Sequence, residues 1–286
     1  MKLVQSIGAI AAVTVALSLA GRSLVAQSPT HITMPFSDPS RPGTLKVRLV
    51  QGGLTVRAAS GRDVIVDASG GLRQRVDSQS SRSSRADGLR RLSQPSGVTI
   101  EEESNVISIT ARPNDDGHLD VQVPARTNLQ VSLVNGCDLV VERVEGDIEV
   151  NNVNGSIRLT EVAGSVVAHS VNDDVVATVR QVATQKPMAF TSLNGDVDVT
   201  LPASLKANLK LRSDQGDVYT DFDVVTTSAP PASAAQSGQE RGRSSDAAKG
   251  KYRLRVDRSI YGSVNGGGPE IELRTFNGDV FLRKGK

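Results

Sequence analysis

The stretch EGDIEVNNVNGSIRLTEVAGSVVAHSVND, residues 145–173, decides the fold because it repeats one short pattern. Apolar residues follow Gly146, Gly155 and Gly164 at the second, fourth and seventh positions. Alternation with period two places the first two of each set on one face of a strand. The third lies beyond an extra step, where the chain must turn a corner, and glycine, Asn or Asp suits such a turn. The predicted inward residues are Ile148, Val150, Val153, Ile157, Leu159, Val162, Val166, Ala168 and Val171.

The same device recurs between residues 133 and 223 and again near the C-terminus. At Gly136 the apolar pattern slips by one position, which predicts a one-residue bulge. The predicted turn and ladder residues are Asn135, Gly136, Gly146, Asn154, Gly155, Gly164, Asn172, Asn194, Gly195, Gly216, Asn277 and Gly278.

A fixed short period indicates small units stacked into a coil, since one unit cannot bury its own apolar face. Successive Asn corners, with Gln215 in the last place, are 18 to 22 residues apart. Stacked amides can hydrogen-bond along the axis because each has a donor and an acceptor. We therefore predict an all-β, single-domain β-solenoid (β-helix-like) of short stacked strands. The alternative is a hairpin protein, because Asn-Gly is also the commonest hairpin turn.

Strand patterns also fill the first half of the chain. They cover 44–50, 54–58, 64–68, 98–101, 106–111, 119–123 and 129–134. Segments 69–97 and 227–250 are rich in small and polar residues and are predicted to be mobile loops. The closing segment 252–284 regains strand character and is predicted to cap the coil.

The N-terminus, residues 1–27, has the pattern of a secretory signal helix. Lys2 supplies the positive start, and Ile7–Ala20 supplies an apolar run shorter than the about 20 residues that a membrane span needs. A membrane anchor is the alternative. We expect an exported protein (periplasmic, cell-surface or secreted), with residues 28–286 as its β-solenoid domain and no transmembrane segment in the mature chain.

Charge balance argues against general polyanion binding. The chain has 33 basic and 31 acidic side chains, and loss of Lys2 and Arg22 with the signal leaves 33 − 2 = 31 of each sign. Nucleic acid is not an expected partner. Six arginines in the first loop are the candidates for contact with an anionic envelope surface. They are Arg73, Arg75, Arg82, Arg85, Arg90 and Arg91.

The sequence has no convergent catalytic pattern. His31, His118 and His169 are far apart and are interpreted as solvated residues, and no cofactor or metal site is predicted. Aspartates after the corners could form a Ca²⁺-binding column, but the favoured interpretation is that they accept hydrogen bonds from turn N–H groups. They are Asp147, Asp174, Asp196, Asp217 and Asp279. The pairs 196/198 and 221/223 put two carboxylates on one outward face, as a glycan-cleaving enzyme would need.

Five segments resemble the bacterial putative-adhesin family of unknown function (the DUF4097 type). They are Gly146–Val150, Asn154–Ile157, Ser192–Val197, Gly262–Pro269 and Thr275–Val280. The resemblance implies an exported β-solenoid, often described as adhesin-like, with no established catalytic residues.

The function expected from these features is a non-enzymatic interaction or adhesion scaffold with an unknown protein or cell-envelope partner. One alternative is a self-associating structural protein of the envelope, stacked end to end through its strand edges. The other is a glycan hydrolase or lyase.

Overall fold

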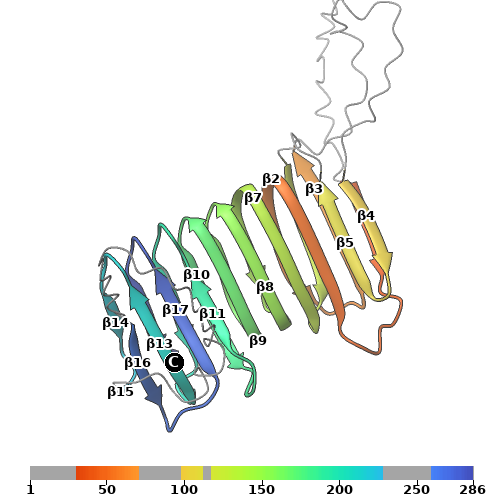
Figure 1. The fold of residues 1–286 in the computed structure, drawn as a ribbon. Coiled ribbons are helices and arrows are strands. Elements are labelled where there is room, and N and C mark those ends of the chain that lie inside the picture. The colour runs from red at the N-terminus through yellow and green to blue at the C-terminus, as the bar shows by residue number, and fades with distance from the viewer. Residues whose placement is uncertain (1–29, 71–97, 112–116, 228–258, 286) are drawn as a thin grey trace, which may run out of the picture.

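The structure, a computed structural model, describes residues 30–70, 98–111, 117–227 and 259–285, and these residues form strands and turns without a helix. Figure 1 shows the strands stacked side by side along one long axis. The first nine are β1 (Thr30–Pro35), β2 (Gly43–Ala59), β3 (Asp63–Gly70), β4 (Val98–Glu103), β5 (Val106–Ala111), β6 (Gly117–Pro124), β7 (Thr127–Glu142), β8 (Glu145–Asn154) and β9 (Ile157–Asn172). The others are β10 (Val175–Val182), β11 (Met188–Thr191), β12 (Val197–Leu201), β13 (Ala207–Ser213), β14 (Val218–Thr220), β15 (Val225–Thr227), β16 (Ile260–Val264), β17 (Glu270–Thr275) and β18 (Val280–Lys284).

Parallel pairing between successive turns confirms the β-solenoid and excludes the hairpin alternative. On the first face the parallel order is β5, β2, β7, β8, β9, β11, β17 and β13. On the second face it is β6, β2, β7, β9, β10, β12, β18 and β14. Strands β2, β7 and β9 turn a corner and contribute to both faces.

The interior is built from files of aliphatic side chains in register. One file on the first face is Ile109, Val47, Val131, Val150, Ala168, Phe190, Leu273 and Leu211, all buried. The large Phe190 is the register partner of the small Ala168, and both are fully buried, so a large side chain lies next to a small one in a close-packed interior. Each buried aliphatic side chain stabilises the stack by about 1.5–3 kcal/mol.

The bulge predicted at Gly136 is present. Gly52 pairs with Gly136 and Leu54 pairs with Leu139, so β7 holds one more residue than β2 between the two pairs. The extra residue lets the apolar pattern resume in phase on the second face.

The turns do not stack in sequence order at either end of the coil. Strand β2 lies between β6 and β7, although β6 and β7 are adjacent in the chain. Likewise β17 lies between β11 and β13, and β18 lies between β12 and β14. The prediction that segment 252–284 caps the coil is therefore wrong for its last two strands, which form a turn inside the stack. Their apolar files and their Asn-Gly corner match those of any other turn, so they fit between two turns as well as beyond the last.

Antiparallel strands cover both ends. Strand β4 pairs with β5, and β3 and β1 follow β6 at the N-terminal end. Strands β16 and β15 follow β13 at the other end. The signal helix, most of loop 69–97 and residues 228–250 of the second loop lie outside the described residues.

Candidate binding surfaces

One corner of the coil carries a five-residue motif, seen as Ser192-Leu193-Asn194-Gly195-Asp196. We call this edge the Asn corner. The motif recurs on neighbouring turns as 152–156, 170–174 and 275–279, with 133–138 as a bulged version and 213–217 as an altered one. The positions of the motif have different structural roles.

The third position forms the predicted amide ladder. Asn154 Nδ2 donates to Asn135 Oδ1 at 2.9 Å, and Asn172 Nδ2 donates to Asn154 Oδ1 at 2.8 Å. Asn194 Nδ2 continues to Asn172 Oδ1 at 2.9 Å, and Asn277 Nδ2 donates to Asn194 Oδ1 at 2.7 Å. The ladder is confirmed, but Asn277 occupies the place that the sequence assigned to Gln215, because the C-terminal turn is inserted there.

In four repeats the first position holds a buried polar side chain that bonds to a corner carbonyl, whereas Ser170 is buried without such a bond and Leu133 is apolar. Ser192 Oγ donates to Asp173 O at 2.8 Å, and Thr275 Oγ1 donates to Gly195 O at 2.7 Å. Asn152 Nδ2 does the same for Gly155 O at 2.9 Å. Sequence analysis missed these residues, although a polar residue in an inward phase is the signal that could have found them.

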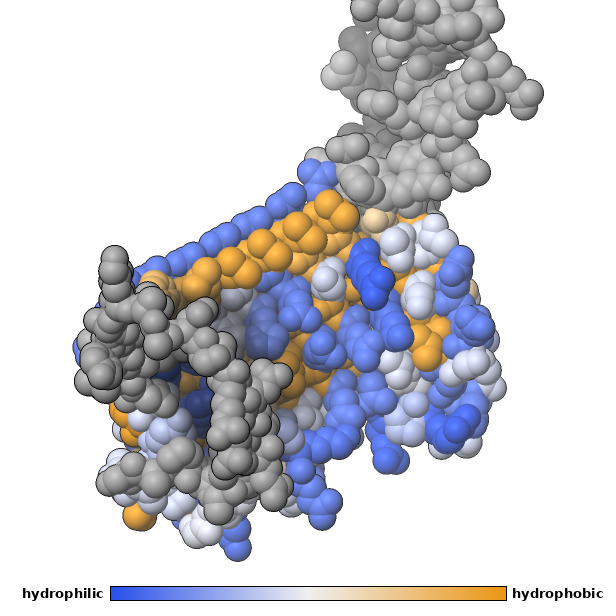
Figure 2. Space-filling model, viewed as in Figure 1, coloured by the Kyte–Doolittle hydropathy of each residue, from blue (hydrophilic) through white to orange (hydrophobic). Residues whose placement is uncertain are grey.

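The second position points outward, which corrects two predicted core residues. Val171 is 36% exposed and Val153 is half-buried, because the polar residue before each takes the inward place. The other members are Val134, Leu193 and Phe276, at 40%, 47% and 40% exposed. These five residues form the apolar ridge. In Figure 2 an orange band runs along the long axis with a continuous blue band beside it.

The last position of the motif forms an acidic row of Asp138, Asp174, Asp196, Asp217 and Asp279. Ser156 takes this position on the turn between Asp138 and Asp174, and its Oγ donates to Asp138 Oδ1 at 2.6 Å. Asp174 Oδ1 accepts the N–H of Asp196, and Asp196 Oδ1 accepts the N–H of Asp279, each at 2.8 Å. Asp279 Oδ1 accepts the N–H of Asp217 at 2.8 Å. The prediction that the corner aspartates accept turn N–H bonds is confirmed for Asp174, Asp196 and Asp279, with the donor on the next turn. In the described part of the chain no such bond is seen for the other two predicted acceptors, Asp147, which binds Lys186, and Asp217, which accepts from the Tyr219 hydroxyl. Within the described residues no group of three or more His, Cys, Asp or Glu is arranged to hold a metal ion.

Some of the predicted site residues lie on the opposite corner of the coil rather than on the Asn corner. Gly146 and Gly164 stack there in register, and Asp147 pairs with Lys186 at 2.6 Å, so Asp147 does not belong to the acidic row. A Cβ added to Gly164 would lie 2.1 Å from Gly146 O. Glycine is needed here for close approach between turns as well as for its positive φ of 117°.

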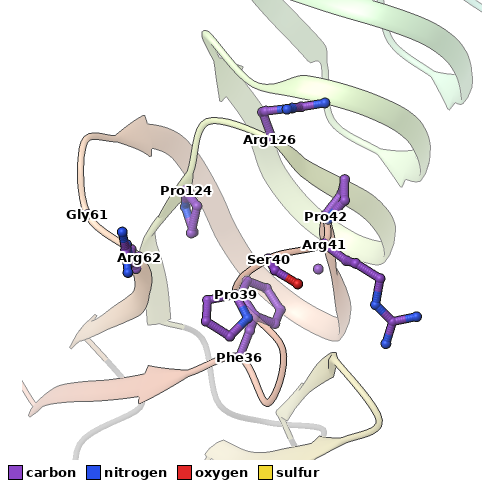
Figure 3. A pocket seen from close by; sticks show the side chains of 10 residues that line it. Phe36, Pro39, Ser40, Arg41, Pro42, Gly61, Arg62, Pro124 and Arg126 are labelled. Atoms are coloured by element: carbon purple, nitrogen blue, oxygen red, sulfur yellow. The ribbon is translucent and has the colours of Figure 1, made fainter.

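A small cavity on this second corner is lined by three arginines, Arg41, Arg62 and Arg126, with Phe36 and prolines as its wall (Figure 3). Arg41 Nε donates to Asp38 Oδ2 at 2.7 Å, and the three guanidinium groups point in different directions in Figure 3. Its volume of about 160 Å³ is below the about 300–1,000 Å³ of ordinary ligand pockets. The cavity does not gather charge on one point and is a weak candidate for a small-molecule site.

A larger open groove of about 480 Å³ lies beside Gly267-Gly268-Pro269 on the same corner. Asn208 Nδ2 donates to Gly268 O at 2.8 Å, and a Cβ on Gly268 would lie 2.2 Å from Lys206 O. The motif therefore fits the C-terminal turn tightly against its neighbour, which explains these glycines without a ligand.

The catalytic candidates do not converge. His31 lies on β1 beside Asp67, His118 on β6 beside Thr55, and His169 on β9 beside Thr191. Asp198 is held by Arg283 through bonds of 2.8 to 3.1 Å, and Asp221 Oδ1 accepts the backbone N–H of Lys284 at 2.6 Å. Neither predicted carboxylate pair offers the two free carboxyls of a glycosidase.

The arginines of the first loop, Arg73 to Arg91, lie outside the described residues, so their contact with an anionic surface stays a prediction. Across the part of the chain that is described, no helix has the length and apolar content that a bilayer crossing requires.

Residues 137–259 match the Toastrack DUF4097 family model, which confirms the resemblance found in the motifs. No curated protein matches the chain. A putative cell adhesion protein from Clostridium sporogenes, known from its crystal structure, is 9% identical with a TM-score of 0.45, over 90% of this chain and 100% of that chain. A putative adhesin from Bacteroides fragilis is 8% identical with a TM-score of 0.29, over 91% and 98%. The names of the family and of these two proteins do not describe an enzyme.

Proposed function

We propose that this chain is a non-enzymatic, exported scaffold that binds a cell-surface or cell-envelope partner along its Asn corner. The observation that supports this function is the apolar ridge. Single exposed apolar residues are common on protein surfaces, whereas a continuous file of them marks an interaction site. The ridge crosses five turns, about 19 Å at about 4.8 Å per turn.

The ladder beside the ridge makes it a rigid binding edge. Each ladder amide is hydrogen-bonded to its neighbours, so the ridge side chains, which directly precede the amides in the chain, are held at a fixed spacing. A preordered surface loses little conformational entropy when a partner binds.

The test compares binding of the purified mature chain, residues 28–286, to intact cells and envelope fractions with that of a ridge variant. Leu193→Ser with Phe276→Ser removes the two largest ridge side chains. Val225→Ser is the control, because Val225 is 68% exposed but lies on β15, away from the ridge. Loss of binding in the double variant alone is the expected result. Equal binding by all three proteins would exclude the ridge as the contact surface.

The enzymatic alternative is checked by incubating the mature chain with acidic and neutral polysaccharides, with and without Ca²⁺. We expect no cleavage, and release of new reducing ends would overturn the non-enzymatic assignment. End-to-end association is less favoured, since β4 ends in Glu101-Glu102-Glu103 and the outer strands β14 and β15 have three residues each. Charged or short edge strands resist pairing with a further chain.

A further inference from the structure

The carboxylates of the acidic row have no cationic partner among the described residues. Several carboxylates elsewhere in the fold do pair with arginine or lysine, as Asp147 does with Lys186 and Asp198 with Arg283. Among the described residues, no Lys, Arg or His lies within 4.0 Å of the carboxylates of Asp138, Asp174, Asp196, Asp217 or Asp279.

Successive members of the row approach one another at the turn spacing. Asp174, Asp196, Asp279 and Asp217 lie on four successive turns, whereas Ser156 separates Asp138 from them by one turn. Like charges about 4.8 Å apart repel, so these four aspartates form a line of negative charge without a cationic partner. This negative charge affects a neighbouring side chain. The charges of Asp217 and Asp279 are the main causes that raise the pKa of Tyr219 above its usual value.

The row and the apolar ridge lie on the same corner. In the repeats 170–174, 192–196 and 275–279 the aspartate follows the apolar residue by three positions, so their Cα atoms are at most about 11 Å apart. An α-helix with side chains is about 10–12 Å in diameter, and a single segment laid along the axis therefore contacts both lines.

We propose that the Asn corner docks a basic amphipathic polypeptide segment, with its apolar stripe on the ridge and its lysines or arginines on the acidic row. This deepens the proposed function and rests on it. Charge complementarity selects the occupant. An anionic lipid surface would meet the acidic row with like charge, and a second copy of this corner would do the same.

The test uses three synthetic 15-residue peptides of helical period as probes. The first has a leucine stripe and lysines, the second the same stripe with glutamates, and the third the lysines with serine in place of leucine. Fluorescence anisotropy of the labelled peptides measures their binding to the mature chain. We expect the Leu/Lys peptide to bind most tightly and its binding to weaken with added NaCl, because exposed ion pairs are screened by salt.

The decisive variant is Asp174→Asn with Asp196→Asn and Asp279→Asn. Asn keeps the Oδ1 acceptor for the N–H of the next turn, so the corner keeps its bonds and loses only charge. We expect about tenfold weaker binding of the Leu/Lys peptide, the effect of three surface ion pairs of ordinary strength. The control, Asp63→Asn with Asp120→Asn and Asp147→Asn, removes the same charge away from the Asn corner and should change binding by less than about twofold.

Equal weakening by the two triple variants, or equal binding of the Leu/Glu peptide, would overturn the basic-segment proposal. The ridge variant separates this outcome from failure of the proposed function. If Leu193→Ser with Phe276→Ser abolishes peptide binding while the acidic-row variant does not, the ridge remains the contact and only the charge selection is wrong. If neither variant alters peptide binding, both proposals fail.

Discussion

Replacement of Gly164 by alanine tests whether the distance between turns, rather than backbone conformation alone, requires glycine at the corners. Gly164 has a φ of 117°, which alanine adopts with strain of about 1–2 kcal/mol. The added Cβ would also lie 2.1 Å from Gly146 O on the preceding turn. That carbonyl belongs to the backbone, so a turn must shift, at a further cost of about 1–3 kcal/mol. The expected loss of unfolding free energy is therefore about 2–5 kcal/mol.

Two other glycines separate the cost of backbone strain from the cost of the clash between turns. Gly266 has a φ of 88°, but a Cβ there meets nothing within 4 Å, so Gly266→Ala carries the conformational strain alone and should cost about 1–2 kcal/mol. At Gly61 the nearest atom is Asp63 N at 3.9 Å, an ordinary contact, and no positive φ is involved. Gly61→Ala should be neutral or stabilising by about 0.4–1 kcal/mol, because alanine restricts the unfolded chain.

Equilibrium urea unfolding followed by circular dichroism measures all three against the parent protein. The expected order of stability is Gly61→Ala, then Gly266→Ala, then Gly164→Ala. If Gly164→Ala costs no more than Gly266→Ala, the turns are not in close contact at this corner and the reasoning is refuted.

Three further predictions concern the ladder, the core and pH. Asn194→Ala removes two amide–amide hydrogen bonds at an exposed corner where water can replace them, so we expect the free energy of unfolding in urea to fall by about 1–2 kcal/mol. The control, Gln215→Ala on the turn beyond the ladder, should lower it by less than about 0.5 kcal/mol. Phe190→Ala leaves a cavity in the dry interior and should lower the free energy of unfolding by about 3–5 kcal/mol in the same assay, whereas Phe276→Ala on the exposed ridge should lower it much less. Similar losses for the two variants would contradict the assignment of inward and outward residues. A hydrogen bond from the Ser37 hydroxyl lowers the pKa of Glu102 below its ordinary value of 4.5, so the folded state gains stability above that value and loses it as pH falls through the lowered pKa. The stability difference between the parent and Glu102→Gln, measured by urea unfolding at several pH values, should therefore shrink on acidification, and a difference independent of pH would exclude this role.

The sequence predicted the features that depend on local period. Alternation around Gly146 and Gly155 indicates which residues of β8 and β9 are buried, and it does so because a strand has two faces in every structure. The ladder and the bulge at Gly136 were also predictable, since both follow from the spacing of Asn-Gly and of the apolar residues.

The sequence could not predict the order of the turns. Each turn presents the same apolar files and the same corner to its neighbours, so the pattern of Thr275–Asp279 fits between two turns as well as beyond the last. The sequence also could not predict that the acidic row lacks cationic partners, because this depends on which charges face one another across turns that are distant in the chain. Val153 and Val171 were misplaced for a local reason, because the polar residues before them, Asn152 and Ser170, are buried and take the inward place.

The insertion of the C-terminal turn links the fold to the proposed binding surface. Phe276 and Asn277 continue the ridge and the ladder past Leu193 and Asn194, and Asp279 joins Asp196 to Asp217 in the acidic row. Without this turn Asp196 and Asp217 would not be joined through Asp279, and the ridge would lose its only aromatic side chain. The neighbours of this turn on either side are formed by residues 188–201 and 207–220, so its contacts join distant parts of the chain. Such non-local contacts are expected to slow folding. The full surface of the Asn corner therefore exists only in the completely folded chain.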